Sequence, residues 1–208
     1  PHLGVLLLSV SKQWFMTVLP ESWTLDFYAR ALNSDMTRNA LVTSFGLSIA
    51  ATGLDVLLGF GIAWICVRRR TVGSDWLDAF AMLPLAVPGL VIAFGYLGAF
   101  GSTFKDTLLD PRFNPLILLA AGYAIRRLPY MVRAAHAGLE QVSRTYEEAA
   151  ANLGASSGRV FRRVTLPLAA PGLFAGMALI FVWSFTELGT PLVFGMRRVL
   201  PVMIYDGI

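Results

Sequence analysis

Charged residues are scarce in this chain of 208 residues. Only 14% of its residues are Asp, Glu, Lys or Arg, whereas 56% are hydrophobic, and the mean hydropathy is +0.62. The apolar residues are also gathered into long runs rather than spread along the chain. The composition therefore excludes an ordinary soluble domain and predicts an integral membrane protein.

Cysteine and histidine are too few to build a reactive or metal-binding centre. The single cysteine, Cys66, excludes a disulfide framework, and the two histidines, His2 and His136, are too far apart in the sequence to predict a metal cluster. No nucleophile elbow, phosphate-binding glycine loop or two-histidine zinc helix is present. We therefore expect a chain without enzymatic activity, metal site or bound cofactor.

The net charge of +4 does not require a nucleic-acid partner. The arginines cluster beside apolar runs, where they suit anionic lipid headgroups, and no basic groove interleaved with aromatic residues is visible. Membrane lipid is the expected partner of these charges.

Four apolar runs are long enough to cross a bilayer, because a helix needs about 20 mostly apolar residues to do so. They cover roughly residues 40–67, 76–100, 113–132 and 168–195. A further run, 3–10, is too short to cross alone, and the chain starts on Pro1 and stops on an apolar segment. We expect one all-α, polytopic transmembrane domain over residues 1–208, truncated at both ends, with 3–10 as part of a fifth helix.

Arginine and lysine counts predict the orientation of these helices. Seven basic residues fall on one side, namely Lys12, Arg30, Arg38, Lys105, Arg112, Arg197 and Arg198. Ten fall on the other, namely Arg68, Arg69, Arg70, Arg126, Arg127, Arg133, Arg144, Arg159, Arg162 and Arg163. The second side is therefore predicted to be cytoplasmic, and it includes the polar stretch 138–167.

The stretch 138–167, called the coupling loop below, predicts two short helices between two transmembrane runs. The first contains small and acidic residues and ends at Gly154, and the second runs from Ser157 to Val164 with three arginines beside apolar residues. Two amphipathic helices joined at a glycine make a surface suited to docking a partner.

The residues of this loop resemble a known motif. Glu148-Ala149-Ala150, three residues, Gly154, nine residues and Val164-Thr165-Leu166-Pro167 are similar to the EAA loop of permease subunits of binding-protein-dependent ABC importers, which have a MetI-like fold. The family prefers Ile at the position of Val164. The resemblance covers essentially the whole chain.

The resemblance implies the partners and the location of the chain. It implies an ATPase subunit that binds ATP, a periplasmic or extracellular solute-binding protein, a second permease half and a place in the cell inner membrane. It also implies the residues that couple to the ATPase, which are Glu148, Ala149, Ala150, Gly154, Leu166 and Pro167.

The chemistry of these residues suits a rigid lever. Ala149 and Ala150 would let the helix backbone seat deeply in a cleft of the ATPase, Glu148 near a helix start is favoured by the helix dipole, and Gly154 supplies a turn. An ordinary solvated loop with a glycine cap is the structural alternative.

Two carboxylates lie inside predicted spans, where ionisable groups are costly and face a bundle interior or water. Asp55 lies near Gly53, Gly59 and Gly61, which would let another helix pack closely. Glu187 lies beside Gly and Pro residues that loosen a helix. Both are candidates for the translocation path, and contact with a neighbouring helix is the alternative for each.

A kink is also predicted, and it lies at Pro84, Pro88 and Gly89 within the second span. Proline removes a hydrogen bond from the helix and its ring clashes with the preceding turn.

Two segments indicate a solute class by resemblance. Glu187 to Leu192 and Leu19 to Thr24 resemble permeases for ferric iron, polyamines and phosphonates, often built as two fused halves, of which this chain would be most of the second. Two other classes remain open: an ion-coupled secondary transporter that uses Asp55 and Glu187, and a membrane scaffold that transports nothing.

Overall fold

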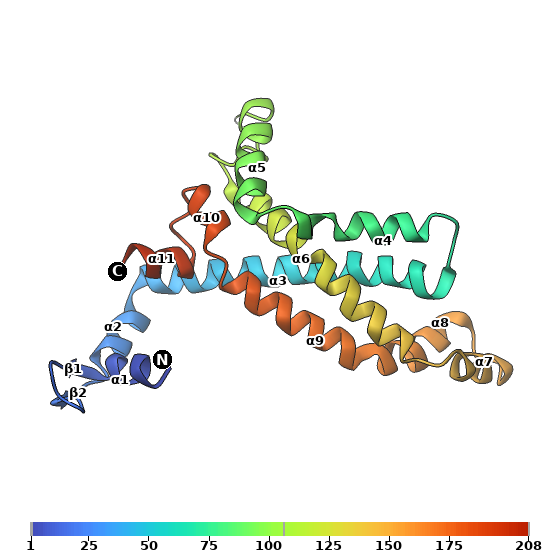
Figure 1. Cartoon of the computed structure of the whole chain (residues 1–208), viewed down its shortest axis with the longest axis horizontal. Coiled ribbons are helices and arrows are strands. Elements are labelled where there is room, and N and C mark those ends of the chain that lie inside the picture. Colours follow the sequence, from blue (N-terminus) through green and yellow to red (C-terminus); the bar gives the residue numbers. More distant parts are fainter. Residues whose placement is uncertain (1, 106, 208) are drawn as a thin grey trace.

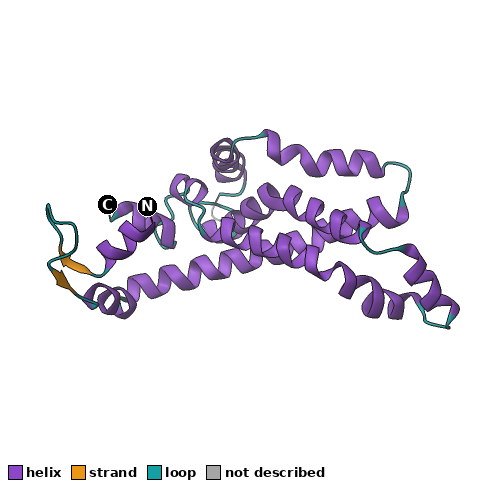
Figure 2. Ribbon diagram, turned by 60° about the horizontal axis from the view of Figure 1, so that its bottom comes forward, coloured by secondary structure: helices purple, strands orange, loops and turns teal. Residues whose placement is uncertain are grey.

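A computed structural model describes residues 2–105 and 107–207 of the chain. Most of the chain is helical, and the sheet in the described part is one small antiparallel pair, β1 (Ser11–Gln13) and β2 (Ser22–Trp23), at one end of the molecule (Figure 2). The predicted all-α class is therefore confirmed.

The helices follow one another with short connections. The α-helices are α1 His2–Ser9, α2 Asp26–Asn33, α3 Asp35–Trp64, α4 Ser74–Met82, α5 Gly89–Thr103, α6 Pro115–Glu140, α7 Arg144–Asn152, α8 Ser157–Val160, α9 Leu166–Phe185, α10 Gly189–Val193 and α11 Leu200–Asp206. Two π-helical turns, η1 Ile65–Arg69 and η3 Phe161–Thr165, extend α3 and precede α9, and a 3-10 turn, η2 Leu83–Ala86, follows α4.

Helices α3, α6 and α9 form the core of the bundle (Figure 1). Small residues bring α6 and α9 together: a Cβ added at Gly172 would lie 2.9 Å from the Cα of Gly138, and one added at Gly176 would lie 2.6 Å from the Cβ of Ala134. Van der Waals contact between close backbones is the main attraction between helices in lipid. The glycines therefore set how closely α9 approaches α6.

Packing of α3 on α6 uses one of the three glycines near Asp55. A Cβ at Gly59 would lie 2.8 Å from the side chain of Met131, whereas Gly53 and Gly61 have no atom within 4 Å of such a Cβ. The predicted close contact near Asp55 is therefore made through Gly59.

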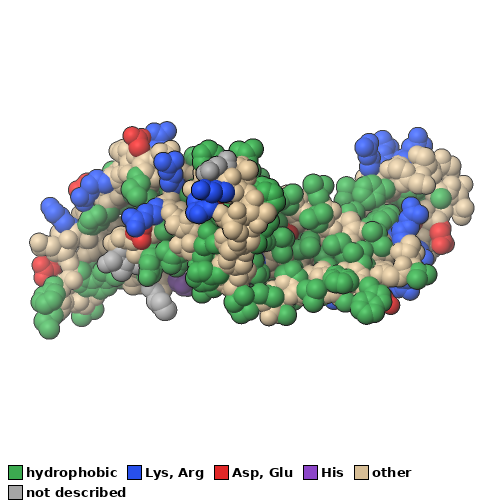
Figure 3. All heavy atoms as spheres, turned by 90° about the horizontal axis from the view of Figure 1, so that it is seen from above, with side chains coloured by type: hydrophobic (Ala, Val, Ile, Leu, Met, Phe, Trp, Pro, Cys, Tyr) green, Lys and Arg blue, Asp and Glu red, His purple; other side chains and the backbone are tan. Residues whose placement is uncertain are grey.

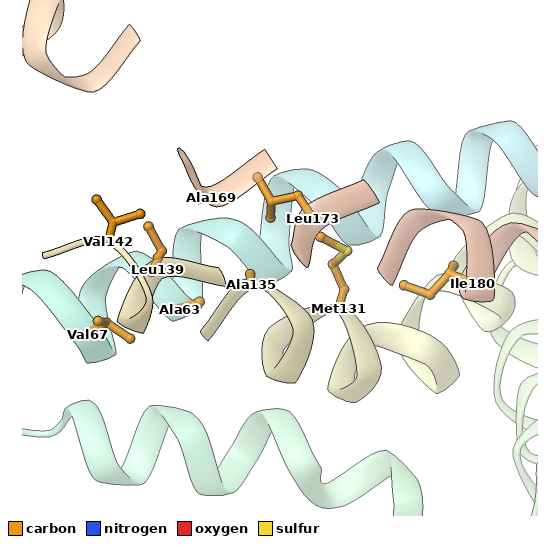
Figure 4. Packing of buried hydrophobic residues seen from close by; sticks show 9 residues of the cluster. All are labelled: Ala63, Val67, Met131, Ala135, Leu139, Val142, Ala169, Leu173 and Ile180. Atoms are coloured by element: carbon orange, nitrogen blue, oxygen red, sulfur yellow. The ribbon is translucent and has the colours of Figure 1, made fainter. Parts of the chain in front are cut away.

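Two apolar clusters lie along the bundle. One contains Ala63, Val67, Met131, Ala135, Leu139, Val142, Ala169, Leu173 and Ile180 (Figure 4). The other contains Leu47, Ala51, Leu119, Tyr123, Ala124, Val199 and Val202. Because α3 and α6 run in the same direction, the stretch between the two clusters places Asp55 of α3 level with Arg127 of α6. A polar layer thus separates the apolar clusters near the middle of both helices.

The second predicted span is sharply bent. The helical segments Ser74–Ala86 and Gly89–Thr103 meet at an angle of 96°, so that α5 projects away from the core (Figure 1). The break falls at Val87 and Pro88, where the backbone is extended or in the polyproline region. The predicted kink is a change of direction between two helices.

The bounds of the remaining predicted spans also differ in the structure. Helix α6 begins at Pro115 but continues to Glu140, past the predicted end at residue 132, because Pro129 is accommodated within it. By length and composition, Asp35–Arg69 and Ser157–Val193 are apolar enough to cross a membrane, and the bent pair adds a third span if it is counted as one.

The face of the molecule drawn in Figure 3 carries most of its visible charge near the two ends. Lys and Arg side chains gather at both ends of the long axis, and hydrophobic side chains cover much of the middle (Figure 3). This distribution is typical of a membrane bundle whose charged ends lie at the two interfaces.

The contact between α6 and α9 predicts the effect of one added methyl group. Gly172→Ala should destabilise the chain by about 1–3 kcal/mol, because the new Cβ overlaps backbone atoms that cannot rotate away. Thermal unfolding of the detergent-solubilised protein measures this. The control is Gly53→Ala, where the space is open and the substitution should be neutral or stabilise by about 0.5–1 kcal/mol. Equal stability of the two variants would contradict this packing.

Candidate functional site

The coupling loop begins with a capped helix. Ser143 accepts a hydrogen bond from the backbone N–H of Thr145 at 3.3 Å, and α7 follows. At its other end Gly154 has φ +87, and the N–H groups of Gly154 and Ala155 donate to the carbonyls of Ala151 and Ala150 at 2.9 and 3.1 Å. This is a left-handed glycine cap. Gly154 therefore supplies the predicted turn.

A buried ion pair fixes α7 to the end of α3. The Nε of Arg68 lies 3.2 Å from Oε1 of Glu147, and the two side chains are 9% and 20% exposed. The hydroxyl of Thr165, just before α9, donates to the same carboxylate oxygen at 2.7 Å. Glu147 thus connects α7 to α3 and to the start of α9.

Further hydrogen bonds hold the same corner together. Nη2 of Arg68 donates to the carbonyls of Leu139 and Val142 at 3.0 and 2.8 Å, and Nη2 of Arg144 donates to the carbonyl of Val67 at 3.2 Å. These carbonyls lie at the end of α6, just beyond it and in η1. The base of the coupling loop is therefore joined to the core by charged hydrogen bonds.

The predicted coupling residues lie on and beside α7. Glu148 and Ala149 are exposed, Ala150 is half-buried, and Leu166 and Pro167 form the first turn of α9. One expectation differs: Ser157 to Val164 is not a separate helix. Helix α8 passes through η3 directly into α9, so that Ser157–Val193 counts as one long helical segment. Pro167 fits there because its missing N–H lies near a π-helical turn.

A second cluster of charges lies in the polar layer of the bundle. Glu187, which is 10% exposed, accepts hydrogen bonds from Nη1 of Arg126 at 3.1 Å to each oxygen and from Nη2 of Arg127 at 2.6 Å. The N–H and hydroxyl of Thr190 lie 3.4 Å from Oε1. Glu187 is therefore paired with two arginines of α6.

Arg127 is the more deeply buried of these two arginines. Its side chain is 5% exposed, its Nη2 also donates to the carbonyl of Trp183 at 2.7 Å, and its guanidinium lies 5.2 Å from the ring centre of Tyr123. Removing one partner of a buried ion pair typically costs about 3–5 kcal/mol. The pair of Arg127 and Glu187 therefore ties α6 to the end of α9.

Asp55 is fully buried on α3. The charge of Arg127 acts on its carboxyl group, but neither carboxylate oxygen has a hydrogen-bond partner among the described residues. Of the two carboxylates predicted for the path, Glu187 lines a cavity and Asp55 is not among the residues that line it.

The cavity at Glu187 has a volume of about 490 Å³. Its walls are residues 84–88 at the break before α5, Arg126, Arg127 and Tyr130 of α6, and residues 183 and 186–188 at the end of α9. Because Arg127 lies at the midpoint of α6, the cavity is near the middle of the bundle. Its walls are mostly apolar and hold three charged side chains, those of Arg126, Arg127 and Glu187.

The sequence-based orientation placed Arg126 and Arg127 at a membrane surface, and the structure corrects this. Both lie in the middle of α6. Without them, the side predicted to be cytoplasmic has eight basic residues rather than ten, against seven on the other side. Sequence reasoning also did not identify Arg68 and Glu147 as the residues that attach α7 to the bundle, and Glu148 stays a predicted contact of the ATPase. One feature of the sequence could have indicated that Arg126 and Arg127 lie away from the membrane surface: they stand between Ile125 and Leu128, within an apolar run.

The comparison with known families decides the class of the chain. Residues 55–206 match the family described as "Binding-protein-dependent transport system inner membrane component". The chain belongs to this family. Its place in the inner membrane and its role as an ABC importer permease follow, and the resemblance seen in the coupling loop is confirmed.

Two relatives agree with this class. The chain is 33% identical over 197 residues to "Molybdenum transport system permease protein ModB" of Mycobacterium tuberculosis, covering 89% of this chain and 72% of the relative. It is 37% identical over 139 residues to "Sulfate transport system permease protein CysT" of Salmonella typhimurium, covering 64% and 50%.

The fold of the chain is also similar to that of a solved structure. A bacterial ABC transporter involved in the import of the acidic polysaccharide alginate matches with a TM-score of 0.69 at 16% identity, covering 97% of this chain and 70% of that chain. The likeness at this identity concerns the fold of the permease.

The contacts of Glu147 predict different roles for two adjacent glutamates. In the permease without its ATPase, Glu147→Gln should weaken the attachment of α7 and raise hydrogen exchange in residues 144–152 about tenfold, since a hydrogen bond to a charged group contributes about 1.5–3 kcal/mol. Hydrogen exchange read by mass spectrometry measures this. Glu148→Gln is the matched control, because Glu148 is exposed and should leave exchange unchanged. Equal effects would contradict the anchoring role of Glu147.

Proposed function

We propose that this permease forms half of the solute path of an ATP-driven importer and receives movement from its ATPase through the coupling loop. The partners are an ATP-binding ATPase subunit, a solute-binding protein on the outer side and a second permease half, fused or separate. ATP binds to the ATPase subunit, and the permease itself carries out no catalysis. The loop residues 138–167 face the cytoplasm in this proposal.

One observation carries the coupling role: α7 is anchored to both helices that lead into the bundle. Through Glu147 it contacts Arg68 at the end of α3 and Thr165 before α9, while Glu148 and Ala149 stay exposed on its surface. A displacement of α7 by a docked ATPase is therefore passed to α3 and α9 together. Residues Ala150, Gly154, Leu166 and Pro167 shape this lever.

Movement of these two helices acts on the polar layer. Glu187 lies just after α9 and Asp55 lies within α3, so a shift of either helix changes the distance of its carboxylate from Arg127. Alternating access through such rigid-body movement is the mechanism we propose.

The solute we propose is a small oxyanion. The descriptions of the named relatives mention molybdenum, whose common form in water is the oxyanion molybdate, and sulfate. The phosphonate class expected from the sequence shares their negatively charged oxygens. The charged lining of the cavity is two arginines and one glutamate, which favours an anion over ferric iron or a polyamine. Ligand identification on the cognate binding protein, by mass spectrometry after gentle release, tests this solute class.

An ion-coupled mechanism is less well supported. It would need Asp55 and Glu187 to bind a cation in turn, but Glu187 already accepts hydrogen bonds from two arginines. Family membership favours an ATP-driven importer over this mechanism and over a scaffold.

The glycine turn predicts an uncoupled variant. Gly154→Val should leave ATP hydrolysis by the assembled transporter largely intact but reduce uptake at least tenfold, because a β-branched residue at φ +87 moves α7 out of its position. Parallel assays of ATPase activity and uptake in proteoliposomes measure this.

Its control lies in the same loop. Gly158→Val changes a glycine without a left-handed backbone, so it should retain most uptake. Normal uptake in Gly154→Val would contradict the lever, and loss of uptake in both variants would assign the effect to bulk on the loop surface.

A further inference from the structure

The cavity at the break before α5 carries one positive charge more than its carboxylate neutralises. Arg126, Arg127 and Glu187 are the charged residues among those that line it. Arg127 and Thr190 both contact Glu187, so the carboxylate keeps partners without Arg126. Arg126 is thus the surplus charge of the cavity.

Arg126 also differs from Arg127 in its exposure. Its side chain is 40% exposed, against 5% for Arg127, and it pairs with Glu187, the carboxylate that Arg127 already holds. A long side chain with this exposure exchanges partners at little cost, because it does not have to leave a buried site. Arg126 is therefore able to turn from Glu187 to a ligand in the cavity.

The start of α5 adds a second positive feature at the same place. Helix α5 has 15 residues and begins at Gly89, directly after the cavity wall formed by residues 84–88. The guanidinium of Arg126 fills the space that a Cβ at Gly89 would occupy, so it lies against the first turn of α5. The N-terminus of a helix favours an anion, so the start of α5 and the guanidinium of Arg126 both add positive potential at this place.

The carboxylate of the cavity is already occupied. Both oxygens of Glu187 accept hydrogen bonds from arginine, and no group of three or more potential metal-binding side chains occurs within residues 2–105 and 107–207. The walls also include Tyr130 and Trp183, whose ring centres lie 4.7 Å apart and which carry no formal charge.

We propose that this cavity binds a small oxyanion during its passage through the membrane, with Arg126 as the residue that contacts it. Arg127 and Glu187 form the fixed support that positions α6 against α9, and the first turn of α5 lies beside the guanidinium of Arg126. A volume of about 490 Å³ leaves room for an oxyanion with part of its hydration shell. This inference rests on the proposed importer function and gives it a binding residue.

The test uses the whole transporter in proteoliposomes, with both permease halves, the ATPase and the binding protein. ATP-dependent uptake is measured with radiolabelled molybdate and sulfate, and with putrescine as a cationic probe. In the variant Arg126→Gln we expect uptake of the oxyanions to fall at least tenfold, while stimulation of the ATPase by the loaded binding protein is retained.

The matched control is Arg133→Gln. Arg133 lies on the same helix, is about half exposed and pairs with Asp78 at 2.8 Å, but it does not line the cavity. Its replacement removes an equal charge and one ion pair, so uptake should stay within twofold of that of the unmodified transporter.

A conservative variant keeps the test decisive if Arg126→Gln assembles poorly. Arg126→Lys retains the charge but loses the planar, two-pronged donor geometry, so the KM for uptake should rise several-fold with little change in the maximal rate. An unchanged KM in this variant would overturn the assignment of Arg126.

The remaining outcomes separate the site from the function. Normal oxyanion uptake in Arg126→Gln would overturn the anion site and leave the importer function standing. Uptake of putrescine but of neither oxyanion would overturn both the site and the proposed solute class. An unmodified transporter whose ATPase does not respond to the binding protein would overturn the proposed coupling, whatever the variants do.

Discussion

The bundle depends on the cost of placing charge in the middle of a membrane. Arg127 is almost fully buried, and Glu187, just after α9, pairs with its Nη2. The same Nη2 also donates to the carbonyl of Trp183. An unpaired charge at this depth costs several kcal/mol, so α9 has to end where its carboxylate reaches α6. Toward one end of the same helix pair, Gly172 of α9 approaches Gly138 of α6 closely. This close packing of the two helices lets Glu187 reach Arg127.

The need to pair buried polar groups also explains the structure at the base of the coupling loop. The end of α3, the end of α6 and the start of α9 converge there. Arg68 donates to the carbonyls of Leu139 and Val142, at and just beyond the end of α6, and pairs with the carboxylate of Glu147 in α7. Because Glu147 is shared by Arg68 and Thr165, the loop has two attachments to the membrane helices and moves with both. The proposed transmission from ATPase to cavity therefore needs no chain of small displacements, since α3 and α9 are each continuous from the corner to the polar layer.

The charge around the two buried carboxylates became visible only once the helices were assembled. From the sequence, Asp55 and Glu187 are isolated carboxylates within apolar runs, and both are candidates for the translocation path. In the bundle, Arg126 and Arg127 together carry one positive charge more than Glu187 neutralises. Asp55 lies buried and does not line the cavity. The charge of a cavity is a sum over residues from several helices, and a single helix does not reveal it.

The sequence by itself determined the membrane class, the all-α fold, the bend near Pro88 and the position of Gly154, because hydrophobic runs, proline and glycine act on the chain locally. Only the tertiary structure decided that Glu147, rather than Glu148, anchors the coupling loop, and that Arg126 and Arg127 face Glu187 instead of a lipid headgroup. These pairings join residues about 60 to 80 positions apart, as the contacts of Arg68 and Arg126 show. Such distances are closed by the packing of α3, α6 and α9, which no local pattern specifies.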